Sequence, residues 1–200
     1  PVIENHLKTG KIEPQHQATL TLNPQASLTC RGISNNGHLK LLGNQDAKAS
    51  IIVEEFPLNK KQITYTLDTE NQPKMLVGSP LSGSNPNLYE AATFNGQNWQ
   101  SLEDSLVSWA PFKAFLLTAD STGEIVFGGE INWGDYAFQD STTTGSLVPL
   151  ANPYPAYLNW ETINKEGLSN RALYRIQPSD SSISVFMDGL GDASPLIEPT

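Results

Sequence analysis

Few side chains in this sequence are of the types that perform covalent chemistry. The 200 residues include three histidines, His6, His16 and His38, and one cysteine, Cys30. None of the histidines forms a metal-binding pattern such as His-Glu-x-x-His, and no serine lies in the Gly-x-Ser-x-Gly turn that exposes a hydrolase nucleophile. Cys30 lies in an alternating segment, where it is predicted to be a small structural residue of a strand. We therefore predict no enzyme activity, no catalytic residue and no metal or cofactor.

Paired carboxylates are the next candidates for chemistry. Glu54-Glu55 and Glu103-Asp104 are neighbours in sequence. Neighbours on a strand point to opposite faces, whereas glycoside hydrolysis needs two acids that face each other across a cleft. Residues 188–192, Asp-Gly-Leu-Gly-Asp, place oxygen ligands near glycines but lack the ordered acidic spacing of an EF-hand. Solvated charges and an ordinary turn are the favoured interpretations.

Aromatic side chains are the best candidates for binding. Their apolar faces and polar atoms suit stacking against sugar rings, with Asn and Gln side chains to read hydroxyl groups. Trp99 and Trp109 fall near strand positions, which favours a role in the core. Trp133, Tyr154 and Tyr157 occur in loop contexts. These three are the predicted ligand-binding residues, should the module bind a glycan.

Composition excludes several classes of partner. The formal net charge is −9 and the pI is about 4.7. The nearest approach to a basic patch is Lys60-Lys61, so nucleic acid is not an expected partner. No stretch approaches the roughly 20 apolar residues of a membrane-spanning helix, so membrane insertion is not expected. The sequence starts Pro-Val-Ile-Glu, without initiator Met or signal pattern, from which we expect that the natural N-terminus has been removed.

The predicted elements are short strands. Alternation of apolar with polar residues, interrupted by Asn, Gly and Pro, predicts strands over 18–22, 27–30, 38–42, 50–54, 62–67, 75–77, 87–90, 98–102, 112–117 and 124–127. Strands this short and this closely spaced indicate a sandwich, a barrel or the edge of a solenoid. Residues 120–123 resemble the loop of a β-hairpin. One short helix is expected over 160–166, with Asn159 as its N-cap and Gly167 at its end.

An internal repeat suggests a duplicated motif. Residues 76–80 (Leu-Val-Gly-Ser-Pro) resemble residues 150–153 (Leu-Ala-Asn-Pro). Leu-Tyr pairs at 88–89 and 173–174, and the prolines at 111 and 199, extend the match. The second copy lacks a counterpart of the strand after Pro111, which predicts an open sheet edge near the C-terminus. We therefore predict an all-β fold: a strand-rich N-terminal segment (1–60), for which a solenoid is one alternative, then duplicated sandwich-like antiparallel sheets (61–200, units about 61–140 and 141–200).

Residues 150–160, Leu-Ala-Asn-Pro-Tyr-Pro-Ala-Tyr-Leu-Asn-Trp, resemble a signature of large surface and secreted proteins of Bacteroidetes. The segments 22–29, 35–41 and 76–80 resemble further strand segments of that group. Ala151 stands where Gly is usual, and Asn159 where Asp is usual. The resemblance implies β architecture, a location outside the cell or on its outer surface, and a parent protein exported by type IX secretion. It implies no uniform activity, because such parents include adhesins and enzymes with accessory modules.

Together these observations predict a non-catalytic structural or adhesive module of a bacterial cell-surface or secreted protein. Its partner would be a glycan or another surface protein, beside other domains of a larger parent chain. The alternative is a carbohydrate-binding module attached to a polysaccharide-processing enzyme. A third hypothesis is an enzyme whose active site assembles only with other parts of the parent.

Overall fold

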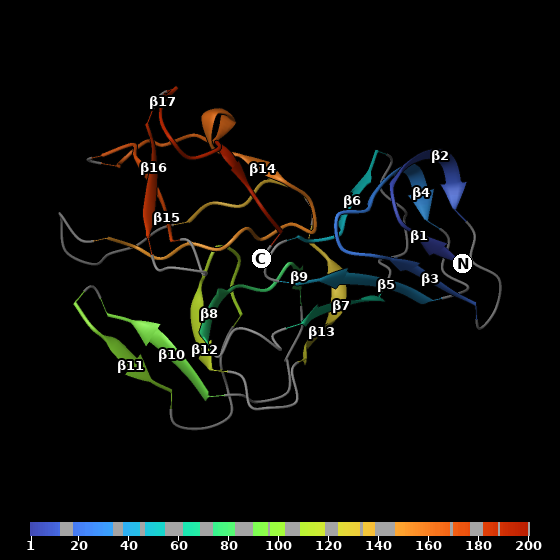
Figure 1. Ribbon diagram of the computed structural model, residues 1–200, viewed down its shortest axis with the longest axis horizontal. Helices are drawn as coiled ribbons and strands as arrows, with labels where there is room; N and C mark the ends of the chain where they lie inside the picture. Colours follow the sequence, from blue (N-terminus) through green and yellow to red (C-terminus); the bar gives the residue numbers. More distant parts are fainter. Residues whose placement is uncertain are drawn as a thin grey trace.

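The computed structural model describes residues 1–12, 18–33, 38–44, 47–54, 62–68, 74–82, 90–95, 97–102, 109–118, 124–132, 134–138, 147–168, 170–176, 182–187 and 189–199 (Figure 1). Nearly all regular structure in these ranges is β-strand, and the one helical element among them is a single 3-10 turn, η1 (Trp160–Thr162). The prediction of an all-β fold is confirmed.

The N-terminal part is a stack of parallel strands in two sheets. One sheet contains, in spatial order, β1 (Val2–Ile3), β3 (Thr19–Leu22), β5 (His38–Gly43) and β7 (Gln62–Asp68). The other contains β2 (His6–Ile12), β4 (Ser27–Ile33) and β6 (Ser50–Val53). The chain alternates between the sheets, and every pairing among these strands is parallel. This is the solenoid alternative, although the sequence pattern did not predict the strands within residues 2–12.

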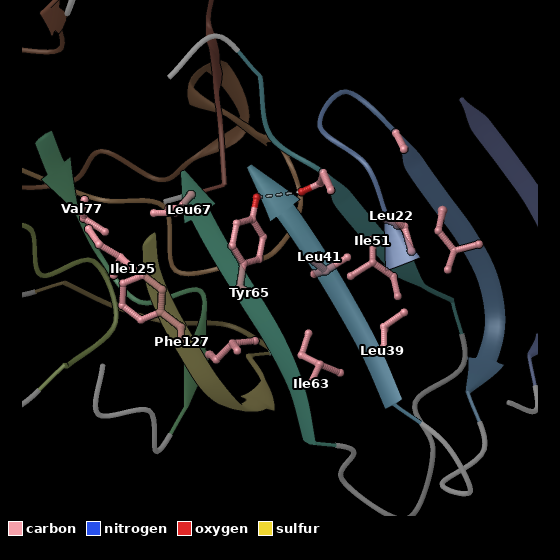
Figure 2. Close-up of a cluster of buried hydrophobic side chains, with 14 of the residues drawn as sticks. Leu22, Leu39, Leu41, Ile51, Ile63, Tyr65, Leu67, Val77, Ile125 and Phe127 are labelled. Atoms are coloured by element: carbon pink, nitrogen blue, oxygen red, sulfur yellow. Dashed lines mark hydrogen bonds between the residues drawn. The ribbon is translucent and has the colours of Figure 1, made fainter. Parts of the chain in front are cut away.

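Period-two alternation builds the core of this stack. The register aligns Leu22, Leu41 and Tyr65 on successive strands, and each of these side chains is fully buried (Figure 2). The Tyr65 hydroxyl donates to the backbone carbonyl of Ala49 at 2.9 Å, so its polar atom is satisfied inside the core. Apolar side chains therefore form continuous internal ladders; the intervening Thr21 and Lys40 are half-buried, whereas Thr66 is buried.

One end of the stack is closed by antiparallel strands. β13 (Glu124–Ile131) pairs along the whole of β7, and β9 (Leu81–Ser82) pairs with β13, which completes a six-stranded sheet. Gly129 is required at this closure, because a Cβ there would lie 2.4 Å from the Ser82 carbonyl oxygen. The six-stranded sheet thus spans both predicted segments, 1–60 and 61–200.

A second, antiparallel sheet faces this closure. Its order is β11 (Trp99–Ser101), β10 (Glu90–Phe94), β12 (Phe115–Thr118) and β8 (Lys74–Val77). Trp109 packs between the sheets, with ring centroids 4.6 Å from Phe115 and 5.4 Å from Phe127. The predicted hairpin around residues 120–123 is wrong, because β12 and β13 pair in different sheets. Turn residues reveal where the chain reverses but not which strand the next segment joins.

The C-terminal part forms two small sheets. β14 (Leu158–Asn159) pairs with β18 (Leu196–Ile197), and β15 (Leu173–Ile176), β16 (Ile183–Met187) and β17 (Leu190–Gly191) form the other. Asn159 caps η1 as predicted, since its Oδ1 accepts from the Glu161 amide at 3.0 Å. The predicted helix over 160–166 is too long, because Ile163 is already extended (φ −73°, ψ 137°).

The two similar segments, 76–80 and 150–153, lie against each other. A Cβ on Gly78 would lie 2.2 Å from the Ala151 Cβ. Pro80 and Pro153 both lie outside strands, as expected of residues that lack an amide donor. The division into duplicated units at 61–140 and 141–200 stays a prediction.

Candidate functional site

Two of the three predicted ligand-binding residues, Tyr154 and Tyr157, lie in the described part of the chain and have different surroundings. Trp133 lies outside the described residues. Tyr154 is half-buried and packs against Tyr136, with ring centroids 5.6 Å apart and planes tilted by 48°. Tyr157 is 45% exposed; partial burial, and then the charge of Glu198, raise the pKa of its hydroxyl, and the charge of Arg175 opposes them. Tyr154 therefore belongs to a ring pair with Tyr136.

Asn152 positions Tyr154. Its side chain is only 2% exposed, and its Oδ1 accepts from the Tyr154 amide at 2.9 Å. Its Nδ2 donates to the carbonyls of Ala156 (2.7 Å) and Ile197 (3.1 Å). This is the structural turn role that a residue before Pro153 suggests. The hydrogen bonds of Asn152 thus connect the loop that contains Tyr154 with the C-terminal segment.

A second buried asparagine holds the neighbouring ring. Asn132 is 5% exposed and donates through Nδ2 to the carbonyls of Pro153 (2.7 Å) and Ser79 (3.3 Å). Its Oδ1 accepts from the Tyr136 hydroxyl at 3.3 Å. Sequence reasoning missed both Asn132 and Tyr136. The strand predicted over 124–127 stops before Asn132, which directly follows the observed β13, so the sequence pattern gave no signal for either residue.

Two phenylalanines form a second ring pair, which a backbone hydrogen bond connects to the residue before Asn152. Phe112 and Phe138 pack edge to face with centroids 6.4 Å apart, and Phe138 is 39% exposed. Phe112 adopts φ +65°, and its carbonyl accepts from the Ala151 amide at 3.0 Å, which connects this turn to the Asn152 loop. We call Phe112, Tyr136, Phe138 and Tyr154 the aromatic patch.

The aromatic patch offers ring faces and hydroxyl groups held in fixed positions. The Tyr154 hydroxyl donates to the Gly134 carbonyl at 2.6 Å. Burial raises the pKa of Tyr154, so the phenol stays protonated at neutral pH. A phenol that donates internally retains oxygen lone pairs as acceptors for a ligand hydroxyl. The chemistry available is non-covalent: stacking and hydrogen bonding.

The remaining tryptophans divide between core and surface. Trp109 packs in the core, as predicted, but Trp99 is 39% exposed and contacts Phe94 on the outermost hairpin. Trp160 is buried, and its Nε1 donates to the Arg171 carbonyl at 2.9 Å.

A histidine and a serine approach each other on the surface of the stack. His6 Nδ1 lies 2.5 Å from Ser27 Oγ, on adjacent parallel strands. Both side chains are exposed, which removes the desolvated setting that activates a nucleophile. Nearby, Glu54 pairs with Lys8 at 3.2 Å, with both side chains well exposed. This agrees with the interpretation of Glu54 as a solvated charge.

The other acidic candidates do not form a metal site in the described part of the chain. Glu55, Glu103, Asp104 and Asp188 lie outside it. Asp192 uses its Oδ1 to accept from the Val185 amide of β16 at 2.9 Å, so this carboxylate binds a neighbouring strand. Among the residues that the structure describes, no cluster of three His, Cys, Asp or Glu side chains is arranged to hold a metal ion.

Two ionisable side chains, Cys30 and Lys48, are buried. Cys30 is fully buried; burial, together with the negative charge of Glu54, raises the pKa of its thiol to about 11. Lys48 is 8% exposed and pairs with Glu198 at 3.4 Å. The pair joins the stack to the C-terminal segment, a contact that sequence patterns cannot show because 150 positions separate the partners.

No protein-family model matches this chain, and neither a curated protein nor a solved structure matches it. The resemblance to Bacteroidetes surface proteins therefore stays a prediction. Within the described residues, no helix has the length and hydropathy needed to cross a membrane.

Proposed function

We propose that this chain is a non-catalytic structural or adhesive module of a bacterial cell-surface or secreted protein. The observation that carries the proposal is the stacked parallel coil, which is closed at one end and hydrogen-bonded to the part that bears the aromatic patch. Stacked strands with continuous internal ladders form stiff, extended bodies in which each coil contacts its neighbours. Such a body suits the presentation of a contact surface away from a cell.

The connection between coil and patch is direct. The Ile51 amide of β6 donates to the Pro155 carbonyl at 2.7 Å, and Lys48, just before β6, pairs with Glu198. Pro155 follows Tyr154 in the loop that Asn152 fixes. The patch is therefore attached to the coil by backbone and ionic contacts, and not through a free linker.

Adhesion is tested by replacement of the segment in its parent protein. We expect that a Gly/Ser linker of equal length in place of these residues lowers attachment of the bacteria to a glycan- or protein-coated surface. Protease treatment of intact cells, with immunoblotting of the parent, reports export and surface exposure separately. Unchanged attachment at equal surface display would contradict an adhesive role, and a parent inaccessible to the protease would contradict the location.

The alternative function is carbohydrate binding, and the Tyr136–Tyr154 pair supports it. We expect that Tyr154→Ala weakens binding on a glycan array and that Tyr154→Phe, which keeps the ring, weakens it less. Tyr174→Ala is the matched control, because Tyr174 is 44% exposed on the separate sheet of β15. Trp133→Ala and Tyr157→Ala complete the set. Strong binding that survives all of the Ala substitutions would rule out this site.

A further inference from the structure

The antiparallel sheet of β8, β12, β10 and β11 has two faces of different character. Side chains alternate between the faces along each strand. Val77, Phe115 and Leu117 point towards the core and are at most 3% exposed. The alternate residues of the same strands form the other face, which we call the outer face. It includes Leu76 and Trp99, which are 38% and 39% exposed, so large apolar side chains meet solvent here.

The strand register places the apolar residues of the outer face side by side. One row crosses all four strands and consists of Leu76, Leu116, Ala92 and Ser101. The next row is the pair of Phe94 and Trp99, on β10 and β11. Their ring centroids are 5.3 Å apart and the ring planes are tilted by 54°. The row of aliphatic and small side chains therefore leads to an aromatic ring at the edge of the sheet.

The turn beside Trp99 is held by hydrogen bonds of its own. Asn95 Oδ1 accepts from the amides of Gln97 at 3.0 Å and Asn98 at 2.8 Å, and the Asn95 amide donates to the Asn98 carbonyl at 3.1 Å. Gln97 and Asn98 are exposed. Figure 1 shows β10 and β11 at the opposite end of the molecule from β1 and β2. The hairpin thus presents an indole ring, with amide side chains beside it, on the periphery of the molecule.

The charge distribution selects a neutral ligand for the outer face. The sequence has no charged residue between Glu90 and Glu103. Within the four strands only Lys74 and Glu90 are charged, and both belong to the row farthest from Trp99. The whole chain carries a net charge of −9, which disfavours sulfated or uronic sugars through repulsion. A neutral sugar matches this surface, because its C–H face is apolar and its hydroxyl groups form hydrogen bonds.

We propose that the outer face binds a neutral glycan, with a sugar ring stacked on Trp99. The exposed side chains of Asn98 and Ser101, beside this ring, supply hydrogen-bonding groups for the sugar hydroxyls. The proposal rests on the adhesive role proposed above, to which it adds a ligand class and a contact site separate from the Tyr136–Tyr154 pair.

A protein partner or a second copy of the chain fits the outer face less well. A stable protein interface needs roughly 1,000 Å² or more of buried surface. Leu76 and Trp99 are the exposed large apolar side chains of this face among the described residues, and β11 offers three residues of strand edge. A sugar ring needs no larger contact than the indole itself.

A glycan array probed with the purified chain tests the proposal, with neutral and acidic oligosaccharides on the same array. We expect binding to neutral oligosaccharides. Calorimetry with the strongest of them should show that Trp99→Ala raises the Kd by about tenfold or more, and that Trp99→Phe, which keeps a ring, raises it less. Tyr174→Ala is the matched control, because Tyr174 is 44% exposed on a different sheet, and it should leave the Kd unchanged. Tyr154→Ala should also leave it unchanged, which distinguishes the two candidate sites.

Urea denaturation reports whether each variant is folded, and Trp99→Leu, which lacks an aromatic face, takes the place of Trp99→Ala if that variant is not. An absence of binding to neutral glycans, binding to acidic glycans alone, or an equal Kd for the original chain and Trp99→Ala overturns the proposal. A chain that is dimeric and becomes monomeric with Trp99→Ala also overturns it and assigns the outer face to a second copy. If replacement of the whole segment lowers bacterial attachment but the chain binds no glycan, this proposal fails while the adhesive role stands.

Discussion

Removal of the Asn152 side chain should be among the most damaging polar substitutions in this protein. Asn152 makes three hydrogen bonds at 2.7–3.1 Å and is 2% exposed. Each such bond contributes about 0.5–1.5 kcal/mol net, and Asn152→Ala leaves all three backbone partners without it. We expect the free energy of unfolding to fall by about 2–4 kcal/mol. For a chain of this size that corresponds to a decrease in Tm of about 4–16 °C.

The assay is urea denaturation followed by tryptophan fluorescence, with the slope compared between variants to verify that the same surface unfolds. Asn152→Asp distinguishes the acceptor role of the side chain from its donor role. It keeps the acceptor for the Tyr154 amide but turns a carboxylate oxygen towards the carbonyls of Ala156 and Ile197. We therefore expect Asn152→Asp to be at least as destabilising as Asn152→Ala at neutral pH.

Asn159→Ala is the matched control. Asn159 makes one side-chain bond, to the exposed Glu161 amide, and loss of such a cap costs about 0.5–1 kcal/mol. If Asn152→Ala is as stable as Asn159→Ala or more stable, the reasoning is refuted. Neither burial nor the number of hydrogen bonds would then affect stability at this site.

Three further perturbations test other parts of the fold. Gly129→Ala should lower stability by about 1–3 kcal/mol through its clash with the adjacent strand, whereas Gly128→Ala, with nothing within 4 Å of the added carbon, should stay within about 0.5 kcal/mol; equal urea midpoints would contradict this. The Cys30 thiol should resist labelling at pH 8 until the protein unfolds; because its pKa rises from 9.0 to about 11 on folding, stability should fall as the pH rises above 9, and the decrease should be smaller in Cys30→Ala, where only tyrosines of raised pKa, such as Tyr65, still contribute above pH 10. Glu198→Gln leaves the Lys48 ammonium buried without its charge partner and should cost about 1–3 kcal/mol by urea denaturation; an unchanged midpoint would show that the pair adds nothing.

The local pattern of the fold could be predicted, but the pairing of strands could not. Alternating leucines located β3, β5 and β7 to within one or two residues of their observed bounds. The same pattern is compatible with parallel or antiparallel neighbours, since side-chain period is two in both. The parallel stack therefore became visible only in the structure, and so did the separation of β12 from β13.

The candidate site likewise contains residues that could be predicted from the sequence and residues that could not. Tyr154 was predicted from its loop context, and the turn role of Asn152 follows from its place before Pro153. Tyr136 could not, because its position beside Tyr154 depends on Asn132, whose side chain bonds both the Tyr136 hydroxyl and the Pro153 carbonyl.

The contacts that join the stack to the C-terminal part converge on a few residues. Asn152 donates to the Ile197 carbonyl, and the next residue, Glu198, pairs with Lys48. Pro155, in the same loop as Asn152, accepts from the amide of Ile51. Because these bonds share one short loop and one short C-terminal segment, the junction resists rotation about any single contact. The orientation of the loop that carries Tyr154 is therefore fixed relative to the coil, as the proposed adhesive role requires.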